Sequence, residues 1–387
     1  MGVESRMSKP AVYTRAFVLT SLAYLCFYTH ISAYNLLPLY LQALGARTGE
    51  IGTIMAMFSV AAILGQTVTG RLLDWGWRKR CLLGAAILLT AVSTAFGATS
   101  RLGWPLYLLR FMQGLGFAVY MTSGMTLIAD MAPPARRAEA VGVYGSGGLI
   151  ALALGPAVGE VILGAGGFPA FFAATVGVAA ATLVLAAMVP VPPTAPAPRG
   201  LRLGWDGWAP FLPLLLPGFQ YGLANTILFA FLPTFARAAA LPRVGPFYVA
   251  YTGAAILVRF AGGGLADRLG REHVILPGLA AMTAGILLCS SLHVTWLLVA
   301  IGLLNGTAQG VVMPAASALA FERAPAGRRG QAVALYTGAN LVGGTLGAGG
   351  FGWLAQAFGY RPAFVLASGA LAVGTWAFWR QRETGVF

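Results

Sequence analysis

The chain has 387 residues, of which 58% are hydrophobic and 9% charged, and its mean hydropathy is +0.76. About a quarter of the residues of a soluble globular protein are charged, so this composition excludes a soluble protein and indicates one that lies in lipid. The net charge of +14 comes from basic residues scattered between apolar runs. Nucleic acid is therefore excluded as a partner, because its binding needs basic residues clustered on a folded polar surface.

Apolar segments follow one another along the whole chain. A helix that crosses a bilayer needs about 20 mainly apolar residues. Six segments of this kind span residues 14–40, 48–70, 79–99, 104–131, 138–164 and 168–190. Six more span residues 210–236, 246–264, 273–291, 295–321, 330–358 and 361–379. The sequence therefore predicts an all-α membrane protein with twelve transmembrane helices.

A polar stretch, residues 191–209, separates the two sets of six segments. It contains Pro192, Pro193, Pro196 and Pro198, and such a run of prolines cannot form a regular helix. Most of the 25 Lys and Arg side chains lie in loops on the same side of the membrane as this stretch. Basic loops stay on the cytoplasmic side. We therefore expect a cytoplasmic linker and two cytoplasmic termini in a multi-pass protein of the cell membrane.

An internal repeat relates the two halves of the chain. Gly70 and Asp74 match Gly263 and Asp267 at a constant separation of 193 residues. A repeat of this length in an apolar chain is typical of transporters built from two parallel repeats around an axis along the membrane normal. We therefore expect one six-helix bundle at residues 1–190, the linker at 191–209, and a second bundle at 210–387.

The repeated turn resembles motif A of the major facilitator superfamily, which lies between the second and third helices of each half. The second half matches the motif in full, at Gly263, Asp267, Arg268, Gly270 and Arg271. The first half departs from it, because Trp77 stands in place of the second glycine and Gly76 comes one residue early. The resemblance covers nearly the whole chain and implies a secondary transporter of two six-helix bundles.

The resemblance also implies a gating role for the charged turns. Each motif aspartate is expected to approach the positive N-terminal end of a helix in the other half, near residue 330 for Asp74 and near residue 138 for Asp267. The motif arginine is expected to pair with an acid that ends the fourth helix of its half. The candidate gating residues are Gly70, Asp74, Arg78, Asp130, Gly263, Asp267, Arg268, Arg271 and Glu322. The alternative is that these charges are solvated loop residues.

Arg110 lies within the fourth apolar segment, in a stretch that resembles motif B of the family. The resemblance links this arginine to proton coupling or anion handling. An arginine at the centre of a membrane costs about 2.5–3.5 kcal/mol on insertion scales, so its presence there is a hypothesis of function. The alternative is a side chain that extends toward the outer interface, which Trp104 marks.

The fifth segment resembles motif C, which marks antiporters and exporters, at Gly142, Gly155, Pro156 and Gly159. The match is partial, because Ala151 and Glu160 stand where the pattern has glycine. Glu160 is also a carboxylate within an apolar span, which makes it a candidate proton carrier; the alternative is an interfacial position. Arg110, Glu160 and His30 are the coupling candidates, and we expect Arg110 and Glu160, on neighbouring helices, to form a switchable ion pair.

Polar side chains on the first, fourth, seventh and tenth segments are expected to line the substrate cavity, because these helices line it in the family. They are Tyr28, Tyr34, Asn35, Gln113, Tyr120, Gln220, Tyr221, Asn225, Asn305 and Gln309. Aromatic and amide groups without a fixed acid suit a neutral, amphipathic or aromatic substrate. The alternative for each is a contact between helices.

The sequence thus predicts a transporter that works by alternating access, as a monomer in the bilayer. We expect proton-coupled export of a small amphipathic organic compound, with the proton gradient as the driving force. The alternative is an uncoupled facilitator or a lipid translocase of the same fold. An enzyme is not expected, since His30, His273 and His293 are too scattered for a catalytic site. The three cysteines lack metal-ligand spacing, so neither a metal nor a cofactor is expected.

Overall fold

The computed structural model describes residues 13–133, 136–191, 209–261, 269–324 and 329–384, and within them it is helical, without a strand. The first half consists of α1 (Arg15–Ala33), η1 (Tyr34–Leu36), α2 (Leu37–Ala43), α3 (Thr48–Asp74), α4 (Arg78–Ala98), α5 (Trp104–Met131) and α6 (Arg137–Met188). The second half consists of η3 (Ala209–Leu214), α7 (Leu215–Ala238), α8 (Gly245–Ala261), α10 (Arg271–Cys289), α11 (Thr295–Glu322), α12 (Arg329–Phe358) and α13 (Tyr360–Glu383).

The twelve predicted segments each contain helix. The first predicted segment is broken into α1, η1 and α2, and the fifth and sixth form the 52-residue element α6. Gly167 divides α6 in two, since its φ of 65° lies in the left-handed region that favours glycine. In the described part of the chain, eight helices are long and apolar enough to cross a membrane, and one of these, α6, is long enough to cross it twice. The prediction of an all-α membrane fold is confirmed.

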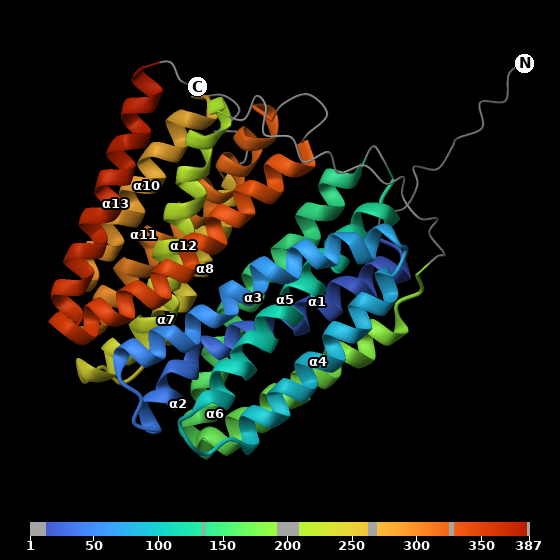
Figure 1. Cartoon of the computed structure of the whole chain (residues 1–387), viewed down its shortest axis with the longest axis horizontal. Coiled ribbons are helices and arrows are strands. Elements are labelled where there is room, and N and C mark those ends of the chain that lie inside the picture. Colours follow the sequence, from blue (N-terminus) through green and yellow to red (C-terminus); the bar gives the residue numbers. More distant parts are fainter. Residues whose placement is uncertain (1–12, 134–135, 192–208, 262–268, 325–328, 385–387) are drawn as a thin grey trace, which may run out of the picture.

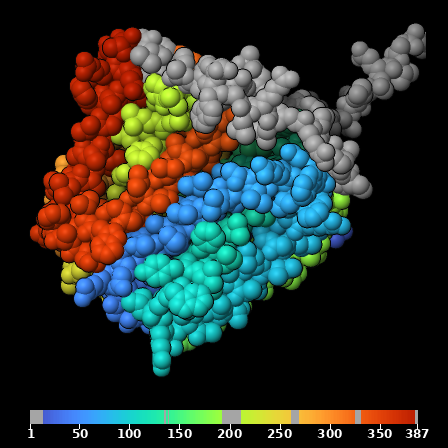
Figure 2. Space-filling view, viewed as in Figure 1, coloured from blue at the N-terminus to red at the C-terminus, as the bar shows by residue number. Residues whose placement is uncertain are grey.

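The helices form two bundles, α1 to α6 and α7 to α13 (Figure 1). The halves meet where α3 packs along α12 and where α6 packs on α8. Figure 2 shows the blue α3 and the orange α12 side by side on this face of the molecule. From their shared end the bundles diverge toward the end where α3 finishes and α12 starts (Figure 1). We call these the closed end and the open end.

Glycines hold the halves together at the closed end. A Cβ atom on Gly52 of α3 would lie 2.4 Å from the carbonyl oxygen of Ala348 in α12, and one on Gly49 would lie 2.9 Å from the Trp353 ring. Neither contact leaves room for a side chain at the glycine. Further toward the open end, a Cβ on Gly344 would lie 3.2 Å from Ser59 Oγ. The α3–α12 contact therefore depends on small residues in both helices.

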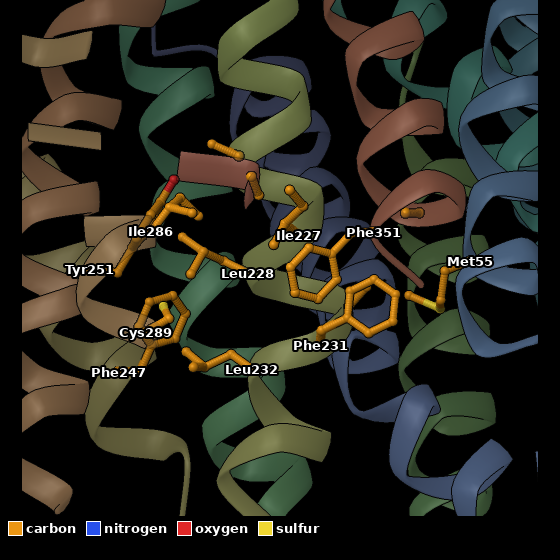
Figure 3. Packing of buried hydrophobic residues seen from close by; sticks show 14 of the residues in the cluster. Met55, Ile227, Leu228, Phe231, Leu232, Phe247, Tyr251, Ile286, Cys289 and Phe351 are labelled. Carbon is orange, nitrogen blue, oxygen red and sulfur yellow. The ribbon is translucent and has the colours of Figure 1, made fainter. Parts of the chain in front are cut away.

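Aromatic side chains fill the space beside this contact. Phe231 of α7 and Phe351 of α12 point toward one another, with ring centroids 4.8 Å apart, and Met55 of α3 lies next to them (Figure 3). All three side chains are buried in one hydrophobic cluster that includes residues of both halves. The closed end is thus a continuous apolar core shared by the two bundles.

Within each half, the same helix crossings recur at the spacing of the sequence repeat. A Cβ on Gly114 of α5 would lie 2.1 Å from the Phe58 carbonyl oxygen of α3, and one on Gly306 of α11 would lie 2.1 Å from the Tyr251 carbonyl oxygen of α8. Because lipid offers little hydrophobic drive for helix association, small residues that allow close backbone approach stabilise such crossings. The internal repeat is therefore a repeat of backbone contacts.

Enlarging Gly306 tests this packing. We expect Gly306→Ala to lower the midpoint of thermal unfolding in detergent, since over-packing costs about 1–3 kcal/mol. The control is Gly253→Ala in α8, where an added Cβ meets nothing within 4 Å and the better helix propensity of alanine should leave the midpoint unchanged or raised. Equal midpoints for the two variants would contradict a tight α8–α11 crossing.

Candidate functional site

A cavity of about 220 Å³ lies between the halves, and Ser59 of α3 and Gly344 of α12 are part of its wall. The first half lines it with Tyr28, Ile31, Ser32, Asn35, Met55, Phe58, Ser59, Arg110, Phe117 and Leu152. The second half lines it with Tyr221, Gly222, Asn225, Thr226, Phe229, Ala230, Gln309, Asn340, Leu341 and Gly344. Both halves thus contribute aromatic and neutral polar side chains to one space.

Arg110 carries the charge of this cavity. It is 6% exposed, and among the described lining residues it is the only one with a charged side chain. Its Nη1 donates a hydrogen bond to Oε1 of Gln113, one turn away on α5. Its guanidinium carbon lies 4.6 Å from the centroid of the Phe58 ring. The Nε atom is buried without a hydrogen-bond partner among the described residues. The positive charge therefore interacts with one neutral amide and one aromatic ring.

On the opposite wall, Tyr251 orients two amide side chains that line the cavity. Its hydroxyl oxygen lies 2.8 Å from Asn225 Oδ1 and 3.2 Å from Gln309 Oε1. A single hydroxyl proton can be donated to one of them at a time. Tyr251 lies on α8 and matches Phe58 of α3 in the repeat, which places an aromatic side chain at this level in each half.

Half of the ten predicted cavity residues line the cavity. These are Tyr28, Asn35, Tyr221, Asn225 and Gln309. The other five, Tyr34, Gln113, Tyr120, Gln220 and Asn305, are buried contacts inside one half, and their assignment to the cavity wall is wrong. The alternative reading as contacts between or along helices holds for these five.

Each of these five side chains contacts residues of its own bundle. The Tyr34 hydroxyl lies 3.4 Å from Thr175 Oγ1, and the Tyr120 ring is stacked 4.0 Å from the Phe27 centroid. Gln220 donates to the Leu371 carbonyl at 2.7 Å, and Asn305 donates to the Ile301 carbonyl at 2.9 Å. Gln113 accepts from Arg110. Neighbouring residues on a helix point about 100° apart, so Tyr34 and Gln220 turn away from the face that Asn35 and Tyr221 present.

Phe58, Ser59 and Asn340 line the cavity although they were not predicted from the sequence. They lie on α3 and α12, the second helix of the first bundle and the fifth of the second, whereas the predicted residues all lie on the first and fourth helices of each half. The sequence did contain one signal for Phe58. Tyr251 is the equivalent residue in the second half, 193 residues later, so both halves have an aromatic side chain at this position. Such a repeated aromatic position indicates that both side chains lie near the same central space.

Of the three coupling candidates, only Arg110 lines the cavity. His30 is 1% exposed and its Nε2 lies 2.6 Å from Ser93 Oγ of α4, inside the first bundle. Its Nδ1 is buried without a hydrogen-bond partner. Glu160 lies at the closed end, and no ion pair in the described residues joins it to Arg110. The expected Arg110–Glu160 pair is therefore wrong, because the two residues face different spaces.

Glu160 instead joins the two halves. Its Oε1 accepts a hydrogen bond from the backbone N–H of Val244 at 2.7 Å, and its Oε2 accepts one from Gly245 at 2.8 Å. Gly245 is the first residue of α8. A carboxylate is stabilised at a helix N-terminus by the free N–H groups and the helix dipole. Glu160 of α6 thus caps a helix of the opposite bundle at the closed end.

Comparison with known proteins decides the family. The model of the Major Facilitator Superfamily matches residues 16–258 and 219–386. This chain belongs to the Major Facilitator Superfamily. It is 24% identical over 410 residues to the multidrug resistance protein MdtG of Citrobacter koseri, a match that covers 93% of this chain and 94% of that protein. The chain is therefore a multi-pass membrane transporter with a small-molecule substrate, and proteins of this kind are not enzymes.

Solved structures of the superfamily share the fold. The peptide transporter POT superposes with a TM-score of 0.80 at 14% identity, covering 95% of this chain and 94% of that one. The nucleoside transporter NupG superposes with a TM-score of 0.75 at 14% identity, covering 95% of this chain and 99% of that one. At these identities the likeness concerns the arrangement of helices alone.

The superfamily's motif A forms one matched ion pair in each half of the protein. Arg78 Nε lies 2.9 Å from Asp130 Oδ2, and Arg271 Nη2 lies 2.8 Å from Glu322 Oε1. Each pair joins the start of the third helix of its half to the end of the fourth, as the repeat predicts. The arginines are partly buried and the acids are exposed. Such pairs contribute at most about 1 kcal/mol each to folding stability. Their main effect is therefore to fix the geometry of the turn.

The motif A turn of the first half is made by Gly76, whose φ is 81°, and its counterpart Gly270 has a φ of 87°. Gly76 therefore supplies the left-handed turn that Trp77 cannot, and Gly70 lies within the last turns of α3. Asp74, the last residue of α3, is exposed. Gly263, Asp267 and Arg268 lie outside the described residues, so the expected position of Asp267 stays a prediction.

Only some of the motif C glycines lie at close contacts between helices. A Cβ on Gly155 would lie 2.5 Å from the Thr29 carbonyl oxygen of α1, and one on Gly159 would lie 3.1 Å from Leu36. Pro156 lies inside α6 between them. A Cβ on Gly142 would meet nothing within 4 Å. Gly155 thus allows α6 to approach α1, Gly159 allows it to approach η1, and Gly142 has no such contact.

Removing the charge of Glu160 tests the cap at the closed end. We expect Glu160→Gln to raise the population open at this end at least about tenfold, because two charge-assisted hydrogen bonds are weakened. Distances between spin labels at Arg101→Cys and Ser291→Cys, with the native cysteines replaced by serine, would measure it.

The matched control is Glu50→Gln at the same end. The Glu50 carboxylate accepts from the Arg47 N–H at 2.8 Å, within one bundle, so its loss should leave the label distances unchanged. Identical distance distributions for Glu160→Gln and the unsubstituted protein would show that the cap does not hold the halves together.

Proposed function

We propose that this protein exports a small amphipathic organic compound across the cell membrane by alternating access. The observation that carries the proposal is the cavity that both halves line next to a closed inter-bundle contact. Relatives named multidrug resistance proteins support export as the direction, and so does the partial motif C at Gly155 and Pro156.

The chemistry of the wall supports an amphipathic cargo. Phe58, Phe117 and Phe229 offer apolar surface, while Asn225 and Gln309 offer amide groups that Tyr251 orients. Small-molecule sites commonly combine a mostly apolar wall with a few convergent polar groups. Such a wall retains a molecule with an aromatic body and one polar end.

The presence of one closed and one open end in this form supports an alternating-access cycle. We assign the open end to the cytoplasm, since it carries Arg78, Arg80 and Arg271, and basic loops face the cytoplasm. In this form the cytoplasmic side is open and the Glu160 cap closes the outer side. In the opposite form the cap separates, and Asp74 approaches the N-terminus of α12 to latch the cytoplasmic side.

We propose proton antiport as the driving force, with His30 as the titratable group near the site. A second candidate is uncoupled transport, of a solute or a lipid, which one specific observation favours. The described residues that line the cavity include no carboxylate, and a carboxylate within the membrane is the usual mark of a proton relay.

Flux through purified protein in liposomes tests transport and separates the two candidates. Three membrane-impermeant aromatic probes of different charge are suitable: ethidium, naphthalene-2-sulfonate and 4-methylumbelliferyl glucoside. We expect protein-dependent flux of at least one probe, with accumulation against its gradient when a pH gradient is imposed. Equilibration without accumulation would establish the uncoupled candidate, and absence of flux for all three probes would refute transport of this class.

Neutralising Asp74 tests the cytoplasmic latch. We expect Asp74→Asn to shift the equilibrium toward the form described here, because the attraction of a carboxylate to a helix N-terminus is lost, at a cost of about 0.3–1 kcal/mol. Spin labels at Arg80→Cys and Glu383→Cys would report the open end. The control is Glu272→Gln, which removes a carboxylate paired with Arg323 inside one bundle at the same end. A shift in the control as large as that in Asp74→Asn would argue against a latch.

A further inference from the structure

We infer that the cargo is an organic anion and that Arg110 binds its negative group. The inference rests on the proposed function, because it takes the cavity between the halves as the substrate site. It differs from the neutral cargo that the aromatic and amide residues alone would suggest.

The first support is that no described residue forms an ion pair with Arg110. A guanidinium keeps its charge in proteins, and a charge taken out of water is costly unless an opposite charge and hydrogen bonds compensate it. Arg110 is 6% exposed, its identified hydrogen-bond acceptor is the neutral Gln113, and its Nε has no partner. The Phe58 ring offsets part of the cost. An anionic ligand in the cavity would supply the opposite charge that these neutral groups do not.

The second support is that helix packing does not require this charge. The position equivalent to Arg110 in the second half is Gly302, where a Cβ would lie 2.7 Å from the Phe247 carbonyl oxygen. The same crossing between the second and fourth helices of a half is therefore made without a charged residue. Arg110 occupies a place that a small residue fills in the other bundle, and its side chain lies on the cavity wall.

The third support is the arrangement around the guanidinium. The wall includes the apolar rings of Phe58, Phe117 and Phe229 and the amide side chains of Asn225 and Asn340. A guanidinium binds a carboxylate, sulfonate or phosphate through two parallel hydrogen bonds. The cavity of about 220 Å³ suits a small molecule. The geometry thus suits a free aromatic acid. A lipid headgroup phosphate offers the same kind of negative group to Arg110 but no aromatic body for the three rings.

Binding of a charge-matched set of probes to the purified protein in neutral detergent tests the inference. The probes are 2-naphthoate, the neutral 2-naphthamide and the cation 2-naphthylmethylammonium, measured by calorimetry. We expect the protein to bind 2-naphthoate most tightly, and Arg110→Gln to weaken that binding about ten- to hundredfold, the range for a hydrogen bond to a charged group. Arg110→Lys should retain part of the affinity. The control Arg361→Gln removes an equal charge at the exposed start of α13 and should leave the affinity unchanged.

Each outcome bears on the inference. If the unsubstituted protein binds the amide or the cation as tightly as 2-naphthoate or more tightly, the inference is overturned. This comparison does not depend on whether any variant folds. The proposed transport function would still stand. Unchanged binding in Arg110→Gln also overturns it. Absence of binding by all three probes, together with absence of flux in liposomes, would refute the proposed function as well. Displacement of 2-naphthoate by phosphatidylglycerol but not phosphatidylcholine, without 2-naphthoate flux, would overturn a free anion as cargo.

Discussion

The close approach of α3 to α12 is the constraint on which the arrangement of the two bundles depends. The approach is possible because Gly52 and Gly352 present only hydrogen atoms where their helices cross. In lipid, where burial of apolar surface contributes little to helix association, such backbone contact has to replace it. Met55 and Ser59 of α3 and Gly344 of α12 also line the cavity. The same pair of helices thus both closes one end and forms part of the wall of the site.

The second constraint is electrostatic. The two bundles repeat their backbone crossings and their motif A ion pairs, but not the charge on the cavity wall, because Arg110 of the first bundle corresponds to Gly302 of the second. The cavity is consequently positive on one wall and neutral on the other. A cycle that opens each end in turn keeps this wall at the centre, where the dielectric is low and a charge interacts strongly with any ligand. The asymmetry between the repeats is therefore where substrate selection is expected to lie.

The two ends of the protein use charge in different ways. At the closed end, Glu160 binds the N–H groups that begin a helix of the other bundle. At the open end, the pairs Arg78–Asp130 and Arg271–Glu322 lie within single bundles and hold the turns of motif A in shape. Contacts across the halves must form and break in a transport cycle, whereas contacts inside a half can persist. This division is the one that the proposed alternating-access cycle requires.

The sequence alone determined the helices, the repeat and the ion pairs of motif A, because length and hydropathy decide what spans a bilayer, and repeated residues at a fixed spacing imply repeated contacts. It did not decide which polar side chains face the cavity, as Asn35 and Gln309 do, and which bind inside a bundle, as Gln220 and Asn305 do. That choice depends on the rotation of each helix about its own axis. Neighbouring helices set this rotation by packing. Only the tertiary structure therefore placed Glu160 on the start of α8 and left Arg110 facing the cavity, without an ion pair to any described residue.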